Sequence, residues 1–323
     1  MRRRDLIAAL AAASLATTRA FAQAPPKMLY VGLVGALPRT TPLYVAFEKR
    51  MAELGYEEGK NFAFEFLQTK SVGGYQSAYA ELARRKVDIF VTPGNEPALR
   101  GALAAAGTQP IVMLAIDFDP FEKGYVANLA RPGGNVTGLF VRQIELAAKR
   151  VEFTREALPK AHTLGLWWDV ESHDQAEAAA AAARSIGFEP RLIEVTGQPP
   201  DYAGALGHMD DAPGEPVMIG AGGVFLRDRA AILPLLLARR TPVIAAFREL
   251  VEAGALLSYG ADLVGLFRDA AVYVDRIAKG AKPAELPIEQ PTHFNMEVNL
   301  KTADYLGIAL PPSLTARADE VIE

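Results

Sequence analysis

The sequence predicts an α/β fold with two lobes, each built on a parallel sheet that is covered by helices. The chain has 323 residues and half of them are hydrophobic, which suffices for a large core and, at roughly 100–200 residues per domain, for two domains. Apolar runs typical of strands alternate with runs that have helical spacing. This alternation stops at a glycine-rich corner near mid-chain and then begins again.

Residues 1–22 have the pattern of a signal peptide. Three arginines precede an apolar run from Leu6, and Ala20 to Ala22 form a small-x-small cleavage site before Gln23. No later run approaches the ~20 apolar residues of a spanning helix, so we expect a mature protein that is soluble and periplasmic. Arg3 and Arg4 loosely fit the twin-arginine pattern, which leaves both the Sec and the Tat export routes open. The alternative is a buried N-terminal helix.

The first half of the chain reads as strand, helix, strand, helix, which implies parallel strands. The run 61–69 alternates strictly between apolar and polar residues and predicts a strand near an edge of the sheet. The expected strands are 28–35, 61–69, 87–92 and 111–116, and the expected helices are 43–54 and 75–86.

The corner ARPGGNVTGL, residues 130–139, predicts a helix end followed by a crossover strand at 136–141 that leads into the second lobe. Gly133 or Gly134 would supply the positive φ of a helix C-cap. The alternative is an ordinary surface turn within one larger domain. Beyond the corner we expect helices 145–158, 174–186 and 228–239 and strands 163–169, 191–195, 217–221 and 241–246.

Composition and motifs argue against several function classes. The net charge of −4 disfavours a nucleic-acid partner, and the absence of cysteine excludes disulfides, thiolate nucleophiles and Cys-based zinc sites. The four histidines have no metal-ligand spacing, and no GxSxG, P-loop or GxGxxG motif follows a strand. We therefore expect no catalytic residues, no metal and no cofactor.

Several short stretches of the sequence, taken together, are specific enough to indicate a protein family. They are LGYEEGKN at 54–61, the pair Asp119–Pro120, RPGGNVTG at 131–138, GALLSYG at 254–260 and the ending 299–323. On these residues, the chain from about Lys27 to its C-terminus resembles the family of ABC-transporter substrate-binding proteins that includes tryptophan- and tyrosine-type periplasmic receptors.

The resemblance implies a type I periplasmic-binding architecture, in which two Rossmann-like lobes close on a small molecule. It implies lobe 1 from 27–140 plus 263–283 and lobe 2 from 141–262 plus 284–323. The implied partners are a small-molecule ligand and an ABC permease, and we expect a monomer that does not span the membrane.

Parallel sheets bind ligands beyond the carboxyl ends of their strands, so polar residues at strand exits are the candidate ligand contacts. These candidates are Thr92, Asn95, Asp117, Asp119, Ser172, Gly222, Arg248 and Tyr259.

In the first lobe, Thr92 and Asn95 could hold a carboxylate or could simply cap a helix. Asp117 or Asp119 could pair with an ammonium group, whereas the alternative for Asp119 is a cap on a helix that begins at Pro120.

In the second lobe, Ser172 could likewise contact the ligand or simply cap a helix. Gly222 would let a ligand approach the backbone, and Arg248 could clamp a carboxylate or be solvated. Tyr259 and Trp168 could stack on an aromatic ligand or belong to the core.

We therefore predict an extracytoplasmic receptor that delivers an amino acid or aromatic acid to an ABC transporter, with neutral sugars as the main rival ligands. The alternatives are a receptor that feeds a sensor kinase and an exported α/β enzyme.

Overall fold

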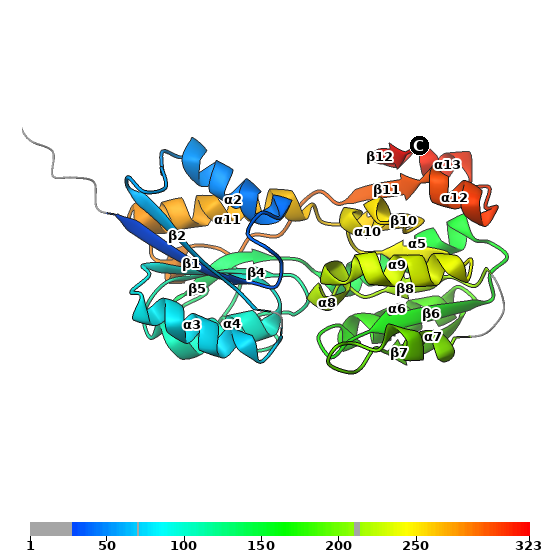
Figure 1. Ribbon diagram of the computed structural model, residues 1–323, viewed down its shortest axis with the longest axis horizontal. Helices are drawn as coiled ribbons and strands as arrows, with labels where there is room; N and C mark the ends of the chain where they lie inside the picture. The colour runs from blue at the N-terminus through cyan, green and yellow to red at the C-terminus, as the bar shows by residue number, and fades with distance from the viewer. Residues whose placement is uncertain (1–27, 70, 210–213) are drawn as a thin grey trace, which may run out of the picture.

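A computed structural model describes residues 28–69, 71–209 and 214–323. It has two lobes that lie side by side, each with a sheet between helices (Figure 1). The predicted signal peptide lies outside the described residues. Within the described ranges, no helix is both long enough and apolar enough to cross a membrane.

The first sheet has five parallel strands in the order β2-β1-β3-β4-β5. As its alternating pattern predicts, β2 is an edge strand. The bounds are β1 Leu29–Gly35, β2 Phe62–Gln68, β3 Ile89–Gly94, β4 Ile111–Ala115 and β5 Val136–Phe140.

Helices cover both faces of this sheet. On one side α2 (Pro42–Glu53) packs against α11 (Leu263–Ala278), and on the other α3 (Gly74–Arg84) packs against α4 (Glu96–Ala106) (Figure 1). Because α11 comes from late in the chain, the first lobe combines residues that precede β6–β10 of the second lobe in sequence with residues that follow them. Burial on both faces explains why β1, β3 and β4 are almost continuously apolar.

The glycine-rich corner differs from the prediction in one respect. Turns and bends, with no helix, connect β4 to β5, so the expected helix end is wrong. Gly133 does have a positive φ, +83°, but in a turn whose backbone N–H donates to the Ala284 carbonyl at 3.3 Å. The corner therefore joins β5 to a segment that returns from much later in the sequence.

That returning segment, residues 284–289, runs along β5. Leu139 and Glu289 form a β-bridge, and the Thr137 hydroxyl donates to the Leu286 carbonyl at 2.8 Å. Gly138 sits between this segment and β4, with φ +137° and no room for a side chain: an added Cβ would lie 2.0 Å from the Met113 carbonyl oxygen. The corner glycines thus allow β5 to fit closely beside β4.

The second sheet has seven strands in the order β12-β11-β10-β9-β8-β6-β7. Its pairings are parallel except that β11 runs antiparallel to β10, a departure from the expected all-parallel sheet. The bounds are β6 Thr163–Trp168, β7 Glu189–Glu194, β8 Val217–Ile219, β9 Val243–Ala245, β10 Leu257–Gly260, β11 Asn295–Asn299 and β12 Glu320–Ile322.

The helices of the second lobe are mostly short. Two long ones, α5 (Gln143–Ala157) and α6 (His173–Ser185), pack together. The helix expected at 228–239 is found as α9, and a short helix that was not expected, α8, comes directly before it. The remaining bounds in this lobe are α7 Tyr202–Gly207, α8 Gly223–Arg227, α9 Arg229–Ala238, α10 Arg248–Glu252, α12 Leu300–Leu306 and α13 Pro312–Thr315, whereas the 3-10 helix η1 (Pro283–Glu285) lies beside β5 in the first lobe.

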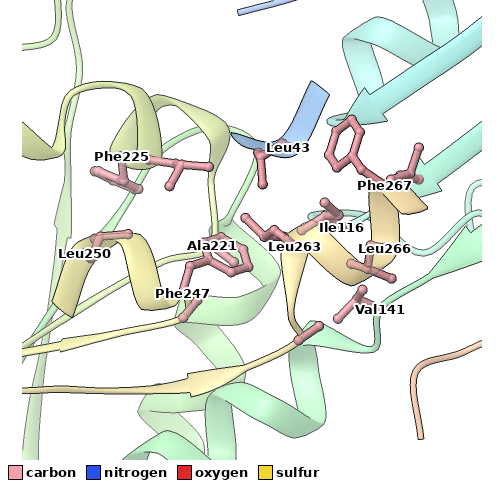
Figure 2. Close-up of a cluster of buried hydrophobic side chains, with 14 of the residues drawn as sticks. Leu43, Ile116, Val141, Ala221, Phe225, Phe247, Leu250, Leu263, Leu266 and Phe267 are labelled. Carbon is pink, nitrogen blue, oxygen red and sulfur yellow. The ribbon is translucent and has the colours of Figure 1, made fainter. Parts of the chain in front are cut away.

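The chain passes between the two sheets three times: after β5, after β10 and before β11. One hydrophobic cluster spans the junction of the lobes (Figure 2). In it, Ile116 and Leu263 lie near Ala221 and Phe247 of the second sheet's loops. The lobes therefore meet through apolar contacts beside the three connections.

Candidate functional site

Two adjoining cavities lie between the lobes, with volumes of about 550 Å³ and about 60 Å³. Ala36, Tyr75, Asn95 and Gly223 line both of them, so we treat them as one cleft. The residues of its walls follow the carboxyl ends of the parallel strands. Loops and helix starts rather than strand interiors therefore form the cleft.

The larger cavity has mixed walls, in which polar and charged side chains lie among apolar ones. The first lobe contributes Thr69 and Ser71, which follow β2, and the second lobe contributes Asp169, Glu171 and Arg227. Exposed Val72 and Val170 also line it, one from each lobe. A ligand in this cavity would touch both lobes at once.

The smaller cavity has mostly apolar and aromatic walls. Tyr44 and Phe267 line it from the first lobe and Phe247 from the second. Figure 2 shows Ile116 and Leu263 between Phe267 and Phe247. Asp117 is the acidic residue in this otherwise apolar wall. The cleft therefore combines apolar surface in the smaller cavity with acidic groups in both cavities.

Asp117 follows β4 and is only 8% exposed. Its Oδ1 atom is buried without a hydrogen-bond partner among the described residues. Burial raises the pKa of Asp117 well above its ordinary value, and the charges of Glu171 and Asp169 raise it further. A buried carboxyl oxygen with no partner is costly, and a cationic group in the cleft would relieve that cost.

Asp169 follows β6 and is 7% exposed. The Ser172 hydroxyl donates to its Oδ1 at 2.6 Å. Gly222 lies against the same carboxylate, because a Cβ added there would be 2.6 Å from each of the two oxygens. Ser172 and Gly222 therefore position Asp169 and do not themselves line the cleft.

Glu171 completes an acidic cluster, which we define as Asp117, Asp169 and Glu171. Burial raises the pKa of Glu171 to about 7, and the charges of Asp169 and Glu96 act in the same direction. Burial also raises the pKa of Asp169, although hydrogen bonds oppose the shift. Mutual repulsion in a partly buried site favours protonated carboxyls until a cation enters.

Arg227 is the only Lys or Arg among the described residues that line the cleft. Its guanidinium pairs with Asp228 at 2.6 Å, and the Tyr202 hydroxyl donates to the same carboxylate at 2.7 Å. These partners hold the guanidinium at the cavity wall.

Asn95 serves two purposes. Its Oδ1 accepts from the backbone N–H of Ala98 at 2.9 Å and so caps α4, while its Nδ2 donates to the Tyr75 hydroxyl at 3.0 Å. Tyr75 begins α3 at the point where the two cavities meet. Capping fixes the amide, and the amide in turn orients the tyrosine hydroxyl.

The other predicted contacts lie away from the cleft. Thr92 is buried within β3, and Asp119 accepts backbone N–H groups of Phe121 and Glu122 in a turn rather than at the start of a helix. Arg248 pairs with Glu252 and Glu320, and Tyr259 packs on Phe153 with ring centroids 4.9 Å apart. None of the four lines either cavity.

Sequence reasoning passed over Thr69, Tyr75 and Arg227. Thr69 and Tyr75 follow the carboxyl end of β2, so the strand-exit rule could have found them had it been applied to the edge strand. Arg227 carries no local signal, since α8 turns it toward the cavity only after the fold has formed.

The cleft suits binding of a small molecule that carries a positive charge. In the part of the chain that the structure describes, no three His, Asp or Glu side chains are grouped so as to hold a metal ion. The acidic cluster faces apolar walls and one fixed arginine, an arrangement suited to an organic cation or zwitterion.

Comparison with known proteins is consistent with this geometry. Residues 41–322 match the family model described as ABC transporter substrate binding protein. A tyrosine-binding protein from Clostridioides difficile (strain R20291) is 23% identical over 268 residues, which cover 81% of this chain and 75% of that protein.

Solved structures share the two-lobed fold. One is described as the ABC domain in complex with L-Trp from Streptococcus pneumonia, with a TM-score of 0.82, 23% identity and coverage of 92% of this chain and 100% of that one. Another is a ligand-free, open substrate binding protein with adhesive properties from Clostridium difficile, with a TM-score of 0.63, 23% identity and coverage of 90% and 98%.

Proposed function

Because the chain belongs to the ABC transporter substrate-binding protein family, we propose that it is an extracytoplasmic receptor that delivers an amino acid or an aromatic acid bearing an amino group to an ABC permease. The family consists of non-catalytic solute-binding proteins, so the chain is not an enzyme. The expected two-lobed α/β fold of the type I periplasmic-binding class is confirmed.

The observation that carries the ligand class is the unpaired carboxyl oxygen of Asp117 in the cleft wall. An ammonium group there would give this oxygen a charge-assisted hydrogen bond and would reduce the repulsion from Asp169 and Glu171. Asp119 has no comparable role, because its Oδ1 accepts two backbone N–H groups.

The other end of the ligand would use the remaining features of the cleft. Arg227 can meet a carboxylate in the larger cavity, while Tyr44, Phe247 and Phe267 offer apolar surface in the smaller one. The tyrosine-binding relative and the structure with bound L-Trp support an aromatic amino acid as the first ligand to test.

The mechanism follows from the position of the cleft. Its walls come from both lobes, so a ligand makes its full set of contacts only when the lobes are closed. Binding therefore stabilises the closed form, which is the form that a permease would recognise.

Isothermal titration against a panel of amino acids and aromatic acids tests the proposal. The bound compound should lose at least tenfold in affinity when its amino group is acetylated, because acetylation removes the charge that pairs with Asp117. A loss of 1.4 kcal/mol corresponds to one factor of ten in affinity. Asp117→Asn should weaken binding by roughly tenfold to a hundredfold, since it removes the charge but keeps the shape.

Asp119→Asn is the matched control and should bind as the parent protein does. Binding of a neutral sugar with unchanged affinity in Asp117→Asn would contradict the proposed ligand class and leave the receptor assignment standing.

A further inference from the structure

The second lobe buries a positive charge for which the described residues provide no negative partner. Arg150 on α5 is 1% exposed. Its Nη1 donates to Gln143 Oε1 and to the Tyr259 carbonyl, both at 3.2 Å, while its Nε has no partner among the described residues. Among those residues no carboxylate forms an ion pair with it.

Such a charge is costly. Burial lowers the pKa of Arg150 to about 9, so the guanidinium is still protonated at neutral pH. Two neutral acceptors do not compensate a full charge in a low-dielectric interior, where uncompensated ions cost several kcal/mol.

A small cavity lies beside this side chain. Its walls come from α5, α6 and the ends of β6 and β8, and Arg150 and Gln175 line it. About 10 Å³ of this cavity is open to the centre of a water-sized sphere, which leaves room for one small monatomic particle. It is separate from the cleft between the lobes, since the two share no lining residue.

Hydrogen-bond donors are in excess around the cavity. Gln175 is 3% exposed and Gln143 4% exposed, and the Nε2 atom of each is buried without a partner among the described residues. Gln175 also belongs to the first turn of α6, the positive end of the helix dipole. Two of these unpaired donors, Arg150 Nε and Gln175 Nε2, belong to residues that line the cavity, Gln143 lies next to Arg150, and none of the lining residues is acidic.

We propose that this cavity binds a single monatomic anion of the size of chloride, held by Arg150 Nε and Gln175 Nε2. A water molecule could accept from the same donors, but it would leave the charge of Arg150 uncompensated. Sulfate and phosphate are too large for the cavity. The anion thus supplies the negative charge that the chain itself lacks at this place.

A hydrogen bond connects this site to the ligand cleft. Gln175 Oε1 accepts from the Ala221 backbone N–H at 3.0 Å, and Ala221 and Gly223 line the cleft. A bound anion would fix the Gln175 amide and, through it, this glycine-rich loop.

Crystals of the parent protein grown in bromide test the site directly. The expected result is an anomalous peak between Arg150 Nε and Gln175 Nε2. Bromide peaks confined to the surface, with an ordered water or empty density in the cavity, would overturn the proposal.

Thermal unfolding gives a second test, with sodium chloride exchanged for sodium gluconate at constant ionic strength. Each tenfold increase in chloride should raise the Tm of the parent by about 3 °C as the site fills. Gln175→Glu places a carboxylate where the anion would lie, so this variant should lose the chloride response and keep the higher Tm in gluconate. Arg150→Met should lose the response as well, since it removes the charge.

Gln76→Glu on the exposed face of α3 is the matched control and should respond to chloride as the parent does. Equal responses in Gln175→Glu and the parent would show that chloride acts elsewhere and would refute the proposal.

Discussion

At the residue scale, the acidic cluster determines how the cleft responds to pH. The folded pKa of Glu171 is raised to about 7, and those of Asp117 and Asp169 are raised as well. A raised carboxyl pKa contributes stability that is fully present below the unfolded value and is lost as the pH rises through the folded value. For Glu171 this window runs from about pH 4.5 to beyond pH 7.

The first prediction concerns this window. The ligand-free protein should lose Tm between about pH 5 and pH 8, and Glu171→Gln should reduce that loss by about 2 °C or more because it removes one titrating group. Differential scanning calorimetry at several pH values measures it. Glu122→Gln, at an exposed position, should leave the pH dependence as it is in the parent.

A second prediction follows from the same groups. A cation that enters the acidic cluster lowers the pKa of these carboxyls, so binding should release protons near pH 7. Titrations in buffers of different ionisation enthalpy should then give different apparent binding enthalpies. Identical enthalpies in all buffers would show that the ligand does not engage these groups.

Gly222 gives a third prediction at this scale. Gly222→Ala should weaken ligand binding at least tenfold, because the new methyl group would displace the Asp169 carboxylate that lies 2.6 Å from its position. Isothermal titration measures the loss. Gly207→Ala, at the end of α7 with nothing within 4 Å, is the control and should bind normally.

At the element scale, the backbones of β4, β5 and the returning segment 284–289 pack closely at Gly138. Gly138→Ala should destabilise the protein by at least about 2 kcal/mol, because φ +137° and the Met113 carbonyl at 2.0 Å both oppose a side chain. Urea unfolding measures the change. Gly134→Ala in the same corner meets nothing within 4 Å and should stay within about 0.5 kcal/mol of the parent.

The sequence predicts helices and strands correctly where the apolar periodicity is strong and incorrectly where it is absent. Strand β2 has an alternating sequence and lies at the sheet edge, as predicted. The sequence of the link from β4 to β5 predicts the end of a helix, which is wrong. Hydrogen bonds to distant residues, such as that from the Gly133 N–H to the Ala284 carbonyl, stabilise the backbone there. No local pattern encodes a partner that lies 151 residues further along the chain.

At the scale of the whole molecule, the proposed function requires the two lobes to close on the ligand. A saturating ligand should lower the radius of gyration in small-angle scattering, because contacts to both lobes hold the cleft closed. Asp117→Asn at the same ligand concentration should show a smaller change, since less of it is bound. An unchanged profile for the parent at saturation would contradict the clamp mechanism.

The sequence by itself determined the class of fold, the restart of the α/β pattern after the mid-chain corner and the family, because apolar periodicity and short motifs are local properties of the chain. Strand exits likewise pointed to Asn95 and Asp117, which line the cleft. Only the tertiary structure decided that Thr92, Asp119, Arg248 and Tyr259 lie elsewhere and that Ser172 and Gly222 position Asp169. It also decided that Arg150 is buried with no carboxylate partner among the described residues. The physical reason is that a strand exit fixes where a side chain begins, whereas its partners come from distant segments that meet only when both lobes have folded.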